Sequence, residues 1–156
     1  MTTTLTAATL TVTVKESIEL NGVEQGATNE KTIASVNEIL KRIVTVTTTE
    51  AEVVAMSTVI ASGTFIEGDV RYMRFTNLDD TNFITLTFKN ENDDEFAIKV
   101  DAGHSFIYPG DNAGGVVDVM DAIDGTGLTY SLGDLVNVTA DADTASCDVE
   151  IFVASV

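Results

Sequence analysis

Two side chains that occur once in the chain, His104 and Cys147, are the first candidates for chemistry. His104 follows Asp101 in an acidic turn, and Ser105 comes next, but neighbours along a strand point to opposite faces and do not form a nucleophile–base pair. Cys147 shares the parity of Val149, which is typical of a small buried hydrophobic residue and not of a reactive thiol. A single cysteine also excludes an internal disulfide and a cysteine-based zinc site. We therefore expect His104 on a surface turn and Cys147 in the core.

Acidic clusters at 93–95, 118–124 and 141–143 invite comparison with calcium sites. Calcium takes roughly six to eight oxygen ligands from converging loops, and DAIDGTG (121–127) lacks the spacing of an EF-hand. GDNAGG (110–115) resembles a phosphate loop only in its glycines, because no GK[ST] follows it. We expect solvated turns in these segments, with a bound structural cation as the alternative. The sequence predicts no catalytic residue, no cofactor and no metal site, and hence no enzyme.

The charge of the chain limits its partners. There are 25 acidic and 8 basic residues, which gives a formal net charge of −17. Such a field repels nucleic acid and anionic membrane surfaces and favours basic partners. No apolar run approaches the roughly 18 residues of a membrane helix, and the N-terminus lacks the positive region of a secretory signal. We expect a protein made in the cytoplasm that binds neither nucleic acid nor membrane directly.

The clearest structural signal runs from Val70 to Val100. Apolar and polar residues alternate with period two in three segments, which indicates half-buried strands. Two turn-rich segments, 77–82 and 90–94, separate them. We predict a three-stranded antiparallel meander with one apolar face that needs a second sheet to cover it. The side chains of that face are Met73, Phe75, Ile84, Leu86, Phe88, Phe96, Ile98 and Val100.

Further strands are predicted on both sides of this segment. Alternation predicts strands at 9–14, 43–48, 53–62, 105–108 and 147–153, and Asn21-Gly22 predicts a tight turn. Residues 26–32 are interpreted as a loop. Residues 34–42 (ASVNEILKR) carry apolar residues at i, i+3 and i+4 with a capping pattern at Ser35, which favours a short helix. Residues 116–123, 128–132 and 135–139 are shorter candidate elements.

These patterns define the fold class as all-β. We predict an antiparallel β-sandwich or jelly roll of about eight to ten strands, with at most one short helix near 35–41. Residues 10–156 form a single domain in this interpretation. Residues 1–9 form a flexible N-terminal arm, or an arm that docks on a partner.

The candidate interaction residues are assigned by charge. The segment 2–9 is uncharged, and such a segment can add a strand to a neighbour's exposed sheet edge. Arg71 and Arg74 are the only arginines of the predicted meander, and we expect them to pair with the Asp-rich turns or with a neighbouring subunit. The predicted interaction residues are Thr2, Thr3, Thr4, Leu5, Thr6, Arg71 and Arg74.

Several segments together resemble a family of small structural virion proteins from tailed, mainly marine, bacteriophages. The resemblance covers about two thirds of the chain, mainly residues 10–108, and rests on the order and spacing of several short motifs. The similar stretches are Leu10–Ser17 (LTVTVKES) with Leu20–Gly22 (LNG), Val36–Ile39 (VNEI) with Lys41–Thr45 (KRIVT), Val70–Tyr72 (VRY) with Asn77–Asn82 (NLDDTN), and Asp101–Phe106 (DAGHSF).

The resemblance implies a structural role in the virion and no catalytic residues. It does not settle the position in the particle, but the charge favours a capsid decoration (cement) protein on the head exterior, where an acidic chain avoids the packaged DNA. It would bridge major capsid proteins, as a trimer or dimer at a symmetry axis. The alternative is a tail or neck component such as a tube, collar or fibre base. A carbohydrate-binding host-contact module is a third reading, with Tyr72, Tyr108 and Tyr130 as the aromatic side chains available for stacking.

Overall fold

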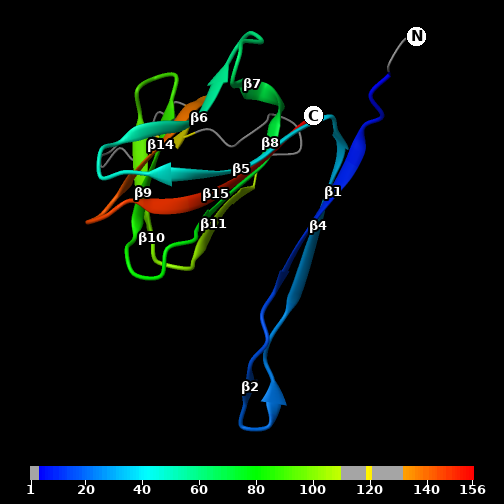
Figure 1. Ribbon diagram of the computed structural model, residues 1–156. Coiled ribbons are helices and arrows are strands. Elements are labelled where there is room, and N and C mark those ends of the chain that lie inside the picture. Colours follow the sequence, from blue (N-terminus) through cyan, green and yellow to red (C-terminus); the bar gives the residue numbers. More distant parts are fainter. Residues whose placement is uncertain (1–3, 110–118, 121–131) are drawn as a thin grey trace, which may run out of the picture.

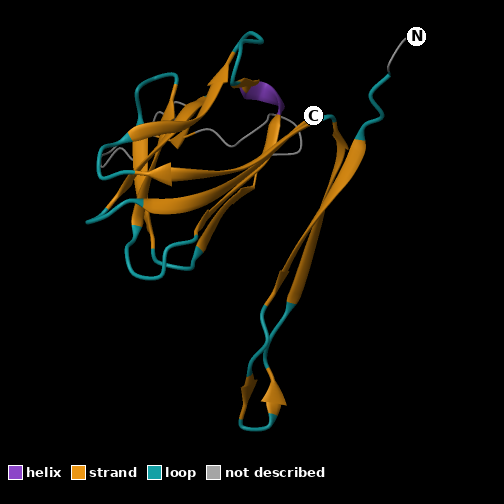
Figure 2. Cartoon of the chain, viewed as in Figure 1, coloured by secondary structure: helices purple, strands orange, loops and turns teal. Residues whose placement is uncertain are grey.

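Alternating apolar side chains build two facing sheets, seen in the computed structural model of residues 4–109, 119–120 and 132–156 (Figures 1 and 2). One sheet has the order β10-β9-β14-β6-β7 and the other β11-β8-β15-β5. The predicted all-β sandwich is confirmed. The strands of the first sheet are β10 (Glu95–Val100), β9 (Ile84–Asn90), β14 (Leu135–Ala142), β6 (Ala51–Ser57) and β7 (Thr64–Ile66), and those of the second are β11 (Ser105–Pro109), β8 (Val70–Asn77), β15 (Cys147–Ser155) and β5 (Glu38–Val46).

The remaining elements are short pairs and one long ribbon. β1 (Ala8–Lys15) pairs with β4 (Thr28–Val36), and β2 (Glu19–Leu20) with β3 (Val23–Glu24). β12 (Val119–Met120) pairs with β13 (Leu132–Gly133). A single 3-10 turn, η1 (Glu67–Asp69), is the helix among the described residues. It occupies the predicted turn before β8.

The core lies between the two sheets and is centred on Phe88. Its ring stacks on Phe96 at 4.8 Å and on Tyr108 at 5.2 Å between centroids, and it meets Phe75 edge-on at 5.9 Å. Cys147 is buried in the same cluster, as predicted. Burial raises the pKa of its thiol, so the sulfur behaves as a small apolar group.

The predicted meander is wrong in its pairing. β9 and β10 form a hairpin, but β8 lies in the other sheet, between β11 and β15. The loop after β8 crosses between the sheets and is held by Asn77, whose buried amide donates to the carbonyls of Asn82 (2.9 Å) and Val100 (3.2 Å). Period-two alternation marks a buried strand face, but it does not specify the hydrogen-bonded neighbour.

The short helix predicted near 35–41 is also wrong. β4 continues to Val36, and β5 begins at Glu38 and pairs with β15 along its whole length. Ser35 has φ of 65° and lies in β4 at the register shift between the Ala8–Val36 and Leu10–Ile33 pairs. Residues 28–32, interpreted as part of a loop, belong to β4. In both places ladder pairing outweighs a weak local helix or loop preference.

Candidate interaction surface

A two-stranded ribbon projects from the sandwich, and we call residues 8–36 the arm (Figure 1). Its strands β1 and β4 are in register from Leu10 opposite Ile33 to Lys15 opposite Thr28. The β2–β3 pair forms its tip around the predicted Asn21-Gly22 turn, where both residues have positive φ. At about 3.3 Å per residue, the 12 steps from residue 8 to residue 20 span about 40 Å.

The strands of the arm cross closely just before the tip. A Cβ atom built on Gly26 would lie 2.1 Å from the backbone oxygen of Glu16, so the crossing requires glycine. The Glu24 carboxylate accepts hydrogen bonds from the backbone N–H of Gly26 (2.8 Å) and of Ile18 (3.1 Å). The tip therefore has a defined orientation that depends on Gly26 and Glu24.

The arm carries an apolar stripe that becomes more exposed toward the tip, formed by Leu10, Val12, Val14, Ile18, Leu20 and Val23. Leu10 and Val12 pack against the sandwich, Val14 is 41% exposed and Leu20 is 60% exposed. Ile18 and Val23 are exposed to a similar extent. A two-stranded ribbon is at best marginally stable alone in water, so the distal half of the stripe needs a covering surface that its own sandwich does not provide.

The root of the arm is seated on the outer face of the β11-β8-β15-β5 sheet. Ile33 and Val36 pack there with Tyr72 and Ala154. The Tyr72 ring meets Phe152 edge-on at 6.0 Å, and burial raises the pKa of the Tyr72 phenol. This second, smaller apolar cluster fixes the arm's direction relative to the sandwich.

The same outer face continues uncovered beyond the arm, on edge strand β5. Ile39 and Ile43 are 64% and 61% exposed. Between them Lys41 lies 3.5 Å from the carboxylate of Glu150, which also pairs with Arg74 at 2.5 Å. The hydrogen bond from Arg74, with the nearby charges, lowers the pKa of Glu150. We call Ile39, Lys41 and Ile43 the β5 patch.

The predicted interaction residues lie in three different places. Arg74 lies on the outer face beside the arm's seat and pairs with Glu150 and Thr76. Arg71 donates to the backbone oxygen of Gly68 at 2.6 Å, within the chain. Thr4, Leu5 and Thr6 are exposed and lead into β1, whereas Thr2 and Thr3 lie outside the described residues. The sequence reasoning missed the distal stripe, although the alternation of 10–14 and the Asn-Gly turn were visible signals.

The residues considered for catalysis or metal binding do not form a site among the described residues. His104 is exposed, and its Nδ1 lies 2.9 Å from the Ala102 oxygen. In the described part of the chain no group of three His, Cys, Asp or Glu side chains could hold a metal ion, and no helix there is long and apolar enough to cross a membrane. The segments 110–115 and 121–127 and Tyr130 fall outside the described residues.

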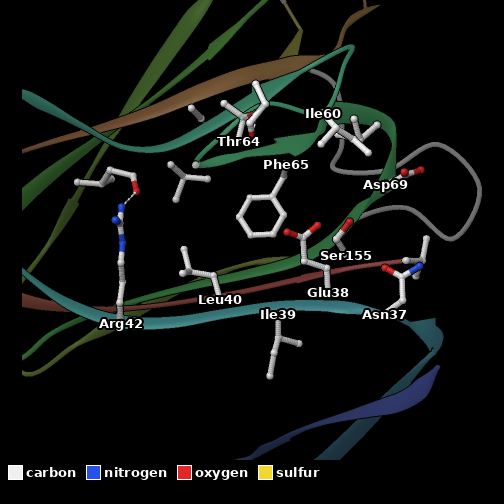
Figure 3. A pocket seen from close by; sticks show the side chains of 17 residues that line it. Asn37, Glu38, Ile39, Leu40, Arg42, Ile60, Thr64, Phe65, Asp69 and Ser155 are labelled. Atoms are coloured by element: carbon white, nitrogen blue, oxygen red, sulfur yellow. Dashed lines mark hydrogen bonds between the residues drawn. The ribbon is translucent and has the colours of Figure 1, made fainter. Parts of the chain in front are cut away.

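A cavity of about 560 Å³ opens at the edge of the sandwich between β5 and the β6–β7 pair (Figure 3). Phe65 and Leu40 line it, and Glu38 and Asp69 supply carboxylates. Arg42 closes one end by donating to the backbone oxygen of Val53. Ile39 also borders the cavity, but Figure 3 shows its side chain on the opposite side of β5 from Leu40, so the side chain of Ile39 faces the outer side of the sheet.

No family model, curated protein or solved structure matches this chain.

Proposed function

We propose that this protein is a structural subunit of a tailed-phage virion, most simply a decoration protein on the head exterior, and that the arm is its assembly element. The observation that carries the proposal is the apolar stripe, which passes from buried at the root to exposed at the tip. Side chains of this kind on a projecting ribbon are stabilised by contact with a neighbouring subunit.

Charge supports a position outside the head. At −17 per copy, many copies next to packaged DNA would be opposed by like charge, whereas an exterior position carries no such cost. A major capsid protein with basic side chains on its outer surface is the kind of partner that this charge favours. Each contact made by an arm would add buried interface that resists internal pressure.

A ring-forming tail or neck subunit is the second candidate, because a sandwich with a long projecting hairpin can also connect successive rings. The carbohydrate-binding reading receives less support. Tyr72 is buried beneath the arm and Tyr108 packs against Phe88, so neither offers an open ring for a sugar.

Copy number in purified particles of the encoding phage tests the proposal. Quantitative mass spectrometry against an isotope-labelled standard of this chain would give copies per major capsid protein. Hundreds of copies, with antibody labelling on the head, are expected for decoration. A few to dozens of copies, with the label at the neck or tail, would refute the decoration role and support the tail or neck subunit. Absence of the chain from particles would overturn both.

The N-terminal segment gives a second test of the same proposal. Deletion of residues 2–9 is expected to abolish binding of the purified chain to particles that lack it, because it removes the uncharged segment and the start of β1. Normal occupancy after this deletion would show that the segment does not dock. Far-UV circular dichroism of the deleted chain would serve as the folding control.

A further inference from the structure

We infer that the partner of the arm tip is a second copy of this chain, which receives the tip on its β5 patch. The inference rests on the proposed role of the arm as an assembly element and names its partner. In the pair, Ile18, Leu20 and Val23 of one copy cover Ile39 and Ile43 of the other.

The two apolar surfaces cannot cover each other within one chain. Ile39 is two residues from Asn37, which joins the arm to the sandwich, so the β5 patch lies at the root of the arm. The tip is about 40 Å away along a ribbon that is paired in continuous register from Leu10 to Lys15. Figure 1 shows the tip far from β5. Each surface therefore needs another molecule.

A dimer with twofold symmetry covers the arm tip and the β5 patch of both copies. If the arms of two copies lie antiparallel, the tip of each arm is at the root of the other, and a twofold axis generates the second contact from the first. The same length of arm separates tip and patch in both copies, so no further adjustment of the fold is required.

The balance of charges on the outer face of the β11-β8-β15-β5 sheet favours contact between two copies of the chain there. On β5, β8 and β15 the charged side chains that share the outward parity of Phe152 are Lys41, Arg74, Asp148 and Glu150, two positive and two negative. The rest of a chain of −17 is strongly acidic, so two copies repel each other least across this face. The tip carries Glu16 and Glu19 beside Glu24, whose carboxylate is held by the backbone of the tip. The ammonium group of Lys41 lies 3.5 Å from Glu150 but its side chain is 62% exposed, so a glutamate of the tip can share it.

The size of the contact sets its strength. Each distal half-arm is about 20 Å long and about 10 Å wide, so two such strips and their seats bury on the order of 800 Å². Stable interfaces bury roughly 1,600 Å². We therefore expect a concentration-dependent dimer that dissociates on dilution and is reinforced when both copies are held in a particle.

Site-specific cross-linking of the full chain tests the inference. A Leu20→Cys chain mixed with an Ile43→Cys chain should give a covalent dimer with a short bismaleimide, because Cys147 is buried and does not compete. The matched control is Ile60→Cys, which is 88% exposed in the β6–β7 loop, away from the outer face. Leu20→Cys mixed with Ile60→Cys should give no more dimer than wild type. Equal yields in the two mixtures would overturn the inference.

Sedimentation velocity across a range of concentrations gives an independent readout. Ile43→Asp should weaken the dimer by about tenfold or more, whereas Ile60→Asp should leave it unchanged. Lys41→Glu should weaken it, and Glu19→Lys in the same chain should restore part of the loss. A wild-type chain that stays monomeric at every concentration would overturn the second copy as partner. If a monomeric chain is found in particles, the dimer is refuted and the proposed function is retained. If the chain dimerises but is absent from particles, the proposed function is refuted and the dimer is retained.

Discussion

Replacement of Asn77 by alanine should destabilise the sandwich more than any surface change, because this side chain holds the crossover between the two sheets. Asn77 is fully buried. Its Nδ2 donates to the oxygens of Asn82 and Val100, and its Oδ1 accepts from the N–H of Asp79 at 3.0 Å. The substitution leaves two carbonyl oxygens and one amide without their partner at the end of β8.

The expected loss can be worked from these three bonds. A net contribution of about 0.5–1.5 kcal/mol for each gives about 1.5–4.5 kcal/mol, and burial places the value near 3 kcal/mol. Asn77→Asp keeps the acceptor for Asp79 but loses both donors and buries a charge, so it should be at least as destabilising. Asn29→Ala, on the exposed part of β4, is the control and should change stability by less than about 0.5 kcal/mol.

Urea unfolding followed by far-UV circular dichroism is the suitable assay, since the chain has no tryptophan. The midpoint should fall while the m-value stays constant, as expected when only the native state is affected. A loss below about 0.5 kcal/mol for Asn77→Ala would refute the role of Asn77 as the anchor of the crossover.

Three further outcomes follow from the core and the carboxyl groups. Phe88→Ala should cost about 3–5 kcal/mol in the same assay, because it removes the ring at the centre of the aromatic cluster. Hydrogen bonds from the N–H groups of Asn82 and Thr81 lower the pKa of Asp79. The ionised carboxylate therefore stabilises the fold fully above about pH 3.9, and this contribution is lost as the pH falls through the folded-state pKa. The difference in unfolding free energy between wild type and Asp79→Ala should disappear over that pH range. Burial, followed by the charges of Asp134 and Glu91, raises the pKa of Glu67. Glu67→Gln should therefore stabilise the chain at neutral pH. The gain should disappear below about pH 4.3, where the carboxyl group is protonated in both the folded and the unfolded state. A stability difference for either carboxyl variant that is independent of pH would contradict these causes.

The strands of the sandwich were predictable wherever one face is buried and the other is not. β8, β9, β10 and β15 were visible as alternating segments because each contributes to the same core. The partner of each strand was not predictable, because alternation is a property of one strand and pairing depends on long-range contacts. For this reason the alternation predicts β8 in one sheet with β9 and β10, whereas β8 pairs with β11 and β15.

The arm shows a different limit. The alternation of β1 and the Asn-Gly turn were evident, but the returning strand β4 reads TNEKT at its start and is almost entirely exposed. The polar start of β4, residues 28–32, pairs with β1 and has no hydrophobic period to reveal it. The β5 patch was obscured for a related reason, since Ile39 and Leu40 resemble one face of a helix in sequence but lie on opposite sides of a strand.

Hydrogen exchange of the arm, in the free chain and in purified particles, tests the role of the arm most directly. In the free chain at low concentration, the amides of Lys15–Thr28 should exchange far faster than those of β9 and β15, because the ribbon lacks a cover. In particles the same amides should become protected. Fast exchange of the distal arm in both states would contradict the assignment of the arm as the assembly element.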